Sequence, residues 1–390
     1  MFLPKGFRFA GVHCGLRASE PGRLDLALVV SDPPATAAGV FTQNRVAAAP
    51  VHVCKERLPR ADARGFVVCS GNANACTGEQ GLRDARRMAD LAARQIDCAP
   101  EQVLVASTGV IGRPLPMAVF ETGIPAAAKA LGSDSKHFEA AATAIRTTDT
   151  RIKTSFKQVG PHAVAGFAKG AAMIGPNMAT MLGFVLTDAA VRPEDLQRIL
   201  RDAVTGSFNC ISVEGHTSTN DTVLILANGT GPVLSGGNLS VFAAATADVC
   251  TDLARAIAAD AEGAEHLVVI DVEGCRSDGE AKTIAKTIAE SALVKSAIYG
   301  ADPNWGRFVS AAGYSGVNFE EADLTLWMGP FELYRAGVPL PFDAKPASAY
   351  LKENREVRLR LNFTLGTGRC RFYTCDLKPE YVHLNAAYTT

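Results

Sequence analysis

The stretch GFAKGAAMIGPNMATMLGFVLT, residues 166–187, joins a loop of unusual composition to an apolar segment. Its first part, 166–180, contains glycines, a proline and an asparagine, which favour turns and backbone conformations that other residues avoid. Its second part, 181–187, is a short apolar run typical of a buried strand. We therefore expect a constrained loop that runs directly into a β-strand headed by Thr180.

Strand-like and helix-like segments alternate along the rest of the chain, which favours a mixed α/β architecture. Short runs rich in β-branched residues predict buried strands at 102–106, 183–187, 222–227 and 267–272. Apolar residues at helical spacing predict helices at 84–96, 193–204, 244–259 and 280–294. Apolar and polar residues alternate from Val357 to Phe363, and the LGTG turn that follows leads into RCRFYT. This last pattern predicts a half-exposed hairpin.

The composition limits the classes of function. The 390 residues are enough for about two to three domains, and the formal net charge of −1 gives no support for binding nucleic acid or an anionic membrane. No apolar stretch reaches the roughly 18 residues of a membrane span, and the N-terminus lacks the apolar core of a secretory signal. The ten cysteines include no CxxC pair, so we expect reduced thiols, no metal site and a cytoplasmic enzyme.

A threonine at position 180 can act as a nucleophile only if a base removes its proton. The α-amine of the same residue can serve, because its reference pKa is about 7.7–8.0, but only if Thr180 is the first residue of a chain. The preceding loop could strain the Ala179–Thr180 peptide toward attack by the Thr180 hydroxyl. From the residues alone, an ordinary turn into a strand stays open as the alternative.

The segment KGAAMIGPNMATML, residues 169–182, resembles the signature of the ornithine acetyltransferase family, also called glutamate N-acetyltransferases or ArgJ proteins. Members of that family cleave themselves between the Ala and the Thr, and only Ala172 departs from the pattern, where Gly is usual. Further family blocks follow in the same order, so the resemblance covers roughly residues 5–390. They are GNANACTG (71–78), STGVIG (107–112), TTDT (147–150), HTSTNDT (216–222), DPNWGR (302–307) and NAAYTT (385–390).

The resemblance implies a four-layer α/β/β/α sandwich of the DmpA/ArgJ type with a smaller C-terminal α/β region. Fragments 1–179 and 180–390 would build it jointly and assemble as α2β2. The implied reaction moves an acetyl group from N2-acetyl-L-ornithine to L-glutamate in two steps, through acetyl-Thr180. It needs no metal or organic cofactor. Some members of the family also accept acetyl-CoA as the donor, and nothing in this sequence decides that point.

The same resemblance assigns the site residues. Thr108 and Gly109, which follow the predicted strand at 102–106 in a tight turn, would form the oxyanion hole. Lys169 would bind a substrate carboxylate from the loop that cleavage releases. The other implied substrate contacts are Thr147, Thr180, Glu262, Asn385 and Thr390. Asn72 and Asn74 are expected to stabilise the start of the helix at 84–96, and DPNWGR to be scaffold around the site.

Four positions depart from the family pattern and leave substrate preference open: Glu214, His216, Glu265 and His266. Two other functions therefore remain under consideration. One is a self-processed amidohydrolase or aminopeptidase, in which water takes the acyl group. The other is a non-catalytic relative that keeps the fold as a binding module.

Overall fold

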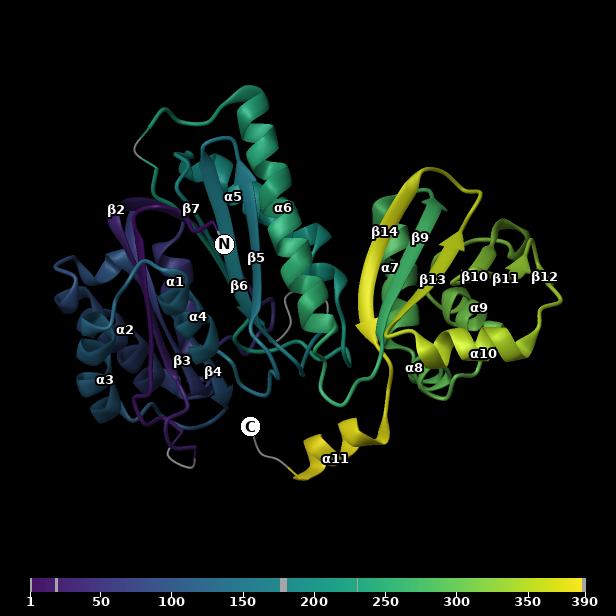
Figure 1. Ribbon diagram of the computed structural model, residues 1–390, viewed down its shortest axis with the longest axis horizontal. Coiled ribbons are helices and arrows are strands. Elements are labelled where there is room, and N and C mark those ends of the chain that lie inside the picture. Colours follow the sequence, from purple (N-terminus) through teal and green to yellow (C-terminus); the bar gives the residue numbers. More distant parts are fainter. Residues whose placement is uncertain (1, 18–19, 176–180, 230, 388–390) are drawn as a thin grey trace.

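The computed structural model describes residues 2–17, 20–175, 181–229 and 231–387 (Figure 1). The predicted cleavage site, Ala179 and Thr180, and the predicted contact Thr390 lie outside the described residues. Figure 1 shows two lobes, with the helix α11 (Pro379–Ala387) running from the C-terminal lobe back beneath the larger one. None of the described helices is long and apolar enough to cross a membrane.

The larger lobe is built on an eight-stranded sheet. Its strands, in spatial order, are β4 (Val103–Val110), β3 (Arg60–Asn72), β2 (Leu26–Phe41), β8 (Thr222–Ala227), β7 (Leu182–Thr187), β6 (His162–Lys169) and β5 (Lys153–Val159), with β1 (Phe7–Val12) paired to β2. The long strand β2 belongs to both halves of this sheet. Its residues 26–30 pair with β3, and its residues 36–41 pair with β8.

The two halves of this sheet face each other. Phe66 on β3 stacks on Phe184 of β7, with ring centroids 4.4 Å apart, although β2 and β8 lie between these strands in the sheet order. Phe167 on β6 approaches the same ring of Phe66 at 6.4 Å. Such contacts require the sheet to turn within β2 and to close into two packed layers around an apolar core.

Helices cover both outer faces, which gives four layers. The helices α1 (Ala49–Arg57), α2 (Gly78–Gln95), α3 (Met117–Lys129) and α4 (Ser135–Ala144) pack on β1–β4. The helices α5 (Pro193–Gly206) and α6 (Gly236–Ala258) pack on the other layer, against β2, β5 and β6. The predicted α/β/β/α sandwich is confirmed.

The predicted helices form for the expected reason. In α2, Ala85, Met88 and Ala92 recur at helical spacing and are buried. Pro193 occupies the first turn of α5, where its missing N–H costs no hydrogen bond. The helix α2 begins at Gly78, ahead of the predicted start, because the polar residues of its first turn carry no apolar signal.

The C-terminal lobe is the predicted smaller α/β region. Its sheet runs in the order β12 (Val338–Pro339), β11 (Phe331–Arg335), β10 (Thr325–Met328), β13 (Glu356–Asn362), β9 (Leu267–Cys275) and β14 (Gly368–Cys375). Its helices are α7 (Asp278–Glu290), α8 (Ala292–Tyr299), α9 (Trp305–Gly313) and α10 (Ala344–Glu353). The described residues also form the single-turn 3-10 helices η1 (Pro100–Gln102), η2 (Phe208–Cys210) and η3 (Glu321–Asp323).

The predicted C-terminal hairpin is wrong. The strands β13 and β14 do not pair with each other, because β9 lies between them, parallel to β13 and antiparallel to β14. The alternation itself is present, since Val357 and Leu359 are buried whereas Arg358 is exposed. Val268, Val269 and Ile270 of β9 are buried on both faces of the sheet, as expected of a central strand that pairs on both edges. The LGTG turn between β13 and β14 does not reveal that a strand from an earlier part of the chain lies between them.

Replacing Phe66 tests the packing between the two layers. We expect Phe66→Ala to lower the free energy of unfolding by about 3–5 kcal/mol, because it removes a buried ring and leaves a cavity. Urea unfolding followed by fluorescence and circular dichroism measures the change. The matched control is Phe2→Ala, since Phe2 is 66% exposed, and it should change stability by less than about 0.5 kcal/mol. Equal unfolding midpoints for the two variants would contradict the layered core.

Candidate functional site

A pocket of about 210 Å³ lies where the end of β4, the end of β6 and the helix α11 come together. It brings together every predicted site residue that the structure describes. These are Thr108, Gly109, Thr147, Lys169, Glu262 and Asn385. They come from both predicted fragments, so the chain must be folded as a whole before the pocket exists.

Thr108 and Gly109 stand near the end of β4, beside an irregularity in its parallel pairing with β3. Gly109 has a φ of +132°, and a Cβ atom built there would lie 2.3 Å from the backbone carbon of Gly71. Only glycine therefore fits at 109. The close approach of the two backbones fixes the main chain of residues 108–109, which lines the pocket.

Lys169 is a buried strand residue, which corrects the expectation that it lies on a loop released by cleavage. It ends β6 and pairs with Leu182 of β7, and it is only 2% exposed. Its Nζ donates to Thr108 Oγ1 at 3.3 Å. Burial lowers the pKa of Lys169, while Asp149 and Asp221 nearby favour its charged form. The pocket thus contains an ammonium group with little access to bulk water.

A buried ion cluster, which the sequence reasoning missed, positions the TTDT turn. Lys153 Nζ lies 2.6 Å from Asp149 Oδ1 and 2.6 Å from Asp260 Oδ2. Asp149 also accepts the backbone N–H of Thr147 at 3.0 Å and that of Gly170 at 2.7 Å. This one carboxylate therefore joins the turn that carries Thr147 to the residue after Lys169. Burial opposes ionisation, but Lys153 and Lys169 hold the pKa of Asp149 well below its usual value.

The far side of the pocket is formed by a turn and by α11. Asn385 Nδ2 donates to Glu262 Oε2 at 3.3 Å, and the backbone N–H of Glu262 donates to Ala171 O at 2.9 Å. The turn at Glu262 is therefore held between the loop that follows β6 and the C-terminal helix. This contact explains why residues near the chain end belong to the same pocket as Lys169.

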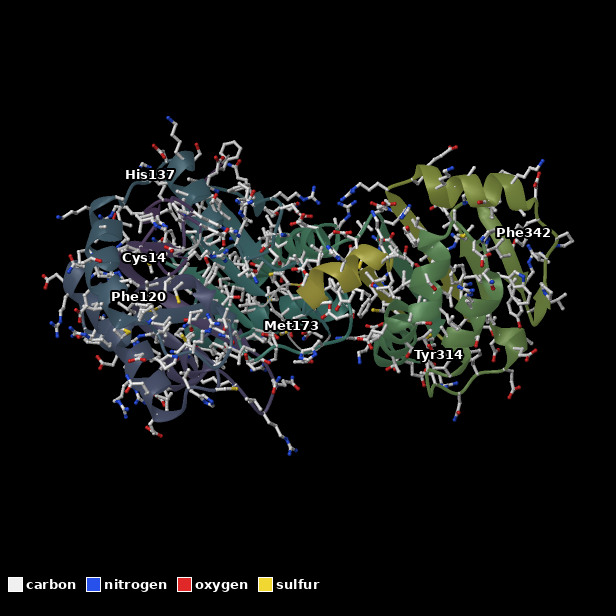
Figure 2. The ribbon with its side chains drawn as sticks, turned by 90° about the horizontal axis from the view of Figure 1, so that it is seen from below. Cys14, Phe120, His137, Met173, Tyr314 and Phe342 are labelled. Atoms are coloured by element: carbon white, nitrogen blue, oxygen red, sulfur yellow. The ribbon has the colours of Figure 1, made fainter. Side chains whose placement is uncertain are left out.

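The loop after β6 has the constrained backbone that the sequence predicts, as far as it is described. Met173, labelled in Figure 2, adopts a φ of +56°, which is unfavourable for a residue with a side chain. The carbonyl of Ile174 accepts three backbone N–H groups, from Val213 at 2.8 Å, Gly215 at 3.2 Å and Glu214 at 3.3 Å. A Cβ atom on Gly175 would lie 2.4 Å from the backbone carbon of Gly215, so this crossing also requires glycine.

Met181, the first described residue after the undescribed segment 176–180, is held by a hydrogen bond. Its backbone N–H donates to Asp221 Oδ1 at 3.0 Å. Burial raises the pKa of Asp221 well above its usual value, although the Met181 N–H and Lys169 oppose that shift. The second oxygen of Asp221 has no hydrogen-bond partner among the described residues. Asp221 belongs to the HTSTNDT block, but its position just before a strand gave no sign of this role.

The four departures from the family pattern lie outside the lining of this pocket. His216 is exposed, Glu265 pairs with Lys378 at 2.5 Å, and His266 Nδ1 lies 3.2 Å from Asp376. Burial raises the pKa of Glu214 to about 7, opposed by the Ile174 backbone and by Lys295. None of the four lines the pocket, although Glu214 lies close enough to Glu262 for the Glu262 charge to raise the pKa of Glu214.

The two remaining motifs are structural. Asn74 Nδ2 donates to Gly81 O at 2.9 Å, and Thr77 Oγ1 donates to Asn74 Oδ1 at 2.8 Å, so the expectation for the start of α2 is confirmed for Asn74. Asn72 does not bond to the helix, because its Nδ2 donates to the carbonyls of Arg113 and Pro114, both at 3.2 Å. DPNWGR was expected around the site, but it lies in the C-terminal lobe. There Asn304 caps α9, and the ring of Trp305 stacks on Tyr334 at 5.6 Å.

A second, larger cavity of about 1160 Å³ adjoins the pocket and shares Thr147, Thr148 and Glu262 with it. Its wall includes Arg23, Arg146 and Arg355. Among the described residues, no group of three or more histidine, cysteine or acidic side chains is arranged to hold a metal ion.

A layered α/β protein that buries an ammonium group, hydroxyls and carboxylates in one small pocket has a site suited to a small, charged substrate. The chain belongs to the ArgJ family, whose model matches residues 8–390. It is 46% identical over 395 residues to the arginine biosynthesis bifunctional protein ArgJ of Geobacter sulfurreducens, covering 99% of both chains. It is 44% identical over 397 residues to the ArgJ protein of Rhodopirellula baltica, covering 100% of this chain and 96% of that one.

A solved structure is also similar. The crystal structure of an arginine biosynthesis bifunctional protein ArgJ from Bacillus halodurans matches with a TM-score of 0.51 and 40% sequence identity. The match covers 98% of that chain but 53% of this one. The predicted fold class and the predicted family are both confirmed.

Replacing Asp149 tests the ion cluster. We expect Asp149→Asn to destabilise the protein at pH 7 by about 3–5 kcal/mol, because it leaves Lys153 buried without one of its counter-charges. The folded-state pKa of Asp149 is depressed, so its stabilisation is present above its unfolded-state pKa of about 3.9 and is lost as the pH falls through the folded-state pKa. The difference from wild type should therefore shrink in acid, as measured by urea unfolding between neutral and acidic pH.

The matched control for this test is Asp202→Asn, whose side chain is 70% exposed. It should lie within about 0.5 kcal/mol of wild type at every pH. A pH-independent effect of Asp149→Asn would show that its carboxylate does not carry the stabilisation.

Proposed function

We propose that this protein is an acetyltransferase of arginine biosynthesis that moves the acetyl group of N2-acetyl-L-ornithine to L-glutamate. In this proposal it acts after self-cleavage between Ala179 and Thr180, as fragments 1–179 and 180–390. The observation that carries the proposal is the convergence of six residues, all assigned by the family resemblance, in one pocket beside the start of β7. The named relatives are arginine biosynthesis proteins, and this chain matches them over nearly their full length.

The backbone on either side of the undescribed segment supports a nucleophile at 180. Lys169 and Leu182 are paired across β6 and β7, and the N–H of Met181 is held by Asp221 at 3.0 Å. The described chain therefore resumes, at Met181, next to the strand that ends with Lys169. The solved ArgJ chain from Bacillus halodurans is covered at 98% yet corresponds to 53% of this chain, a length that suits one of two fragments.

The proposed reaction has two acyl-transfer steps. The free α-amine of Thr180 takes the proton of the Thr180 hydroxyl, and the oxygen attacks the acetyl carbonyl of N-acetyl-ornithine. Backbone N–H groups of residues 108–109 stabilise the oxyanion, and loss of one such donor costs roughly 10²–10³-fold in rate. Ornithine leaves with a proton, acetyl-Thr180 remains as an ester, and the amine of glutamate then takes the acetyl group.

The charged groups of the pocket fit amino-acid substrates. The ammonium of Lys169 can bind a substrate carboxylate, and Asp149 beside it favours the charged form that this contact needs. Glu262 and Asn385 offer oxygen acceptors to a substrate amine from the opposite wall. Thr147 adds a hydroxyl, and Thr390 is proposed as a contact by resemblance alone. The chemistry requires no metal or organic cofactor.

A second donor is favoured by the adjoining cavity. Its volume of about 1160 Å³ and its shared wall with the pocket offer space for a large acyl donor such as acetyl-CoA, although its lining holds acidic residues as well as arginines. We therefore propose acetyl-CoA as an additional donor for glutamate acetylation. An α2β2 assembly and a cytoplasmic location, both implied by the family resemblance, complete the proposal.

Electrophoresis under denaturing conditions tests self-cleavage. We expect two fragments, one beginning at Met1 and the other beginning Thr-Met-Leu-Gly by N-terminal sequencing. Thr180→Ala should remain one inactive chain, because it lacks the hydroxyl that attacks the preceding carbonyl. The control Thr122→Ala, on the exposed face of α3, should be cut normally. An intact, fully active wild-type chain would overturn the proposal.

The acetylation assay separates the proposal from its rivals. Acetyl-glutamate formed only when both N-acetyl-ornithine and glutamate are present supports transfer. Acetate released at the same rate without glutamate indicates an amidohydrolase. No reaction of either kind in correctly folded, cleaved protein indicates a non-catalytic relative.

Replacing Lys169 tests substrate binding. We expect Lys169→Met, which keeps the apolar stem but removes the charge, to lower kcat/KM for N-acetyl-ornithine by roughly 10- to 100-fold, the value of one charge-assisted hydrogen bond. Steady-state kinetics on protein confirmed to be cleaved measures the change. The matched control Lys136→Met, on the exposed surface of α4, should leave kcat/KM unchanged. Equal kinetics for both variants would remove Lys169 from the site.

A further inference from the structure

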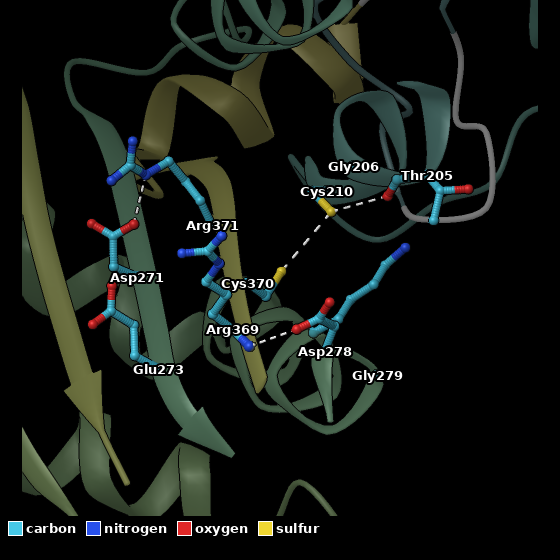
Figure 3. A pocket seen from close by; sticks show the side chains of 11 residues that line it. Thr205, Gly206, Cys210, Asp271, Glu273, Asp278, Gly279, Arg369, Cys370 and Arg371 are labelled. Carbon is cyan, nitrogen blue, oxygen red and sulfur yellow. Dashed lines mark hydrogen bonds and ion pairs between the residues drawn. The ribbon is translucent and has the colours of Figure 1, made fainter. Parts of the chain in front are cut away.

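Two cysteines meet across the boundary between the lobes, remote in sequence from each other. Cys210 ends η2 in the larger lobe, and Cys370 lies on β14 of the C-terminal lobe. Their Sγ atoms are 4.0 Å apart, although 160 positions separate them in the chain (Figure 3). An S–S bond is about 2.05 Å long, so the two sulfurs would have to move closer by about 2 Å to form a disulfide.

The pair opens onto a cavity of about 560 Å³, which is separate from the pocket described above. Cys370 is partly exposed there, and Lys282 and Arg369 belong to the same lining. The basic side chain of Lys282 favours ionisation of both thiols. A small oxidant can therefore reach Cys370, whereas Cys210 beside it is buried, and Lys282 stabilises a thiolate at either residue.

The two thiols are not equivalent. The contact between the two sulfurs lowers the pKa of Cys210, although burial opposes that change. The same contact, together with burial, raises the pKa of Cys370. Both shifts arise from one contact in which either sulfur can be the donor. By contrast, burial raises the pKa of Cys250 to about 12 and that of Cys54 to about 11. Those two are inert core thiols by comparison.

We propose that Cys210 and Cys370 are an oxidation site that forms a reversible disulfide between the two lobes when the protein meets a peroxide. The thiolate of one of the two cysteines attacks one peroxide oxygen, the O–O bond breaks, and water leaves after protonation, so that this cysteine becomes a sulfenic acid. The sulfur of the other cysteine then attacks the sulfenic-acid sulfur, and its hydroxyl leaves as water. Two thiols are oxidised by two electrons in total, and one peroxide is reduced to two waters.

The position of the pair gives such a bridge a structural consequence. The residue after Cys210 forms an isolated parallel bridge with Tyr373, and Ser212 N donates to Tyr373 O at 3.0 Å. Ser212 Oγ donates in turn to Ile174 O at 3.3 Å. A disulfide at 210–370 would therefore fix the contact between the lobes next to the segment that holds the loop after β6. This inference does not depend on the proposed reaction.

Peptide mapping of the oxidised protein tests the site. The full-length protein is treated with a modest excess of hydrogen peroxide, its free thiols are alkylated, and it is digested without reductant. We expect one cross-linked peptide pair joining Cys210 to Cys370, lighter than the two free peptides by two hydrogens. Both residues should lose alkylation and regain it after dithiothreitol. Retained alkylation of both at a dose that oxidises the exposed Cys76 would overturn the proposal.

Single variants separate the pair from other thiols. Cys370→Ser should abolish the cross-link, because Cys210 then lacks its partner thiol. Cys76→Ser, the matched control at an exposed cysteine, should leave the cross-link unchanged. A cross-link that survives in Cys370→Ser, or that joins Cys210 to a different cysteine, would also overturn the proposal. If Cys370→Ser does not fold, the mapping of the wild-type protein decides alone.

Discussion

The antiparallel pairing of β6 with β7 is the constraint on which the site depends. Lys169 and Leu182 are partners in this ladder, so the chain leaves the sheet at one point and returns to it at the neighbouring strand. Strands paired in this way lie about 4.8 Å apart. The sheet therefore holds Lys169 and Leu182 side by side. A chain break between these two residues would leave both strands in place, because β6 and β7 are also paired to β5 and β8.

Buried charged residues then fix the positions of the polar groups that line the pocket. Lys169, Lys153, Asp149, Asp221 and Asp260 are all buried at this end of the larger lobe. Lys153 pairs with Asp149 and Asp260 at 2.6 Å each, which offsets the cost of burying these three charges. Asp149 and Asp221 also favour the charged form of Lys169. Their geometry holds the TTDT turn, the end of β6 and the end of α6 in fixed positions. The result is a pocket whose polar groups are oriented before any substrate arrives, which lowers the cost of binding a small charged molecule.

The C-terminal lobe contributes to the pocket because the chain passes from it back to the larger lobe. Its central strand β9 directs β14 back toward the larger lobe, and α11 then crosses to place Asn385 beside Glu262. The pocket therefore has one wall made of residues that come late in the sequence. The contact at Cys210 and Cys370 lies on the same lobe boundary, so the two lobes meet both at the pocket and at the thiol pair.

The sequence by itself determined the local elements and the family. The patterns of apolar residues predicted the strands β4, β7, β8 and β9 and the helix α5 close to their observed bounds. A continuous apolar run indicates a buried strand, and apolar residues at helical spacing indicate a helix with one buried face. The motifs around 108, 147, 169, 262 and 385 named residues that the structure gathers in one pocket. The site residues came from the family resemblance, since a lone lysine or threonine carries no local signal of its role.

Only the tertiary structure decided the rest. It showed that β9 separates β13 from β14, that Lys169 is a buried strand end, and that DPNWGR belongs to the other lobe. It also supplied Asp149, Asp221 and Lys153 as the groups that hold the pocket in shape. The physical reason is the same in each case. Strand partners, buried ion pairs and close backbone crossings join residues far apart in the chain, and the energy of such contacts leaves no pattern within either segment alone.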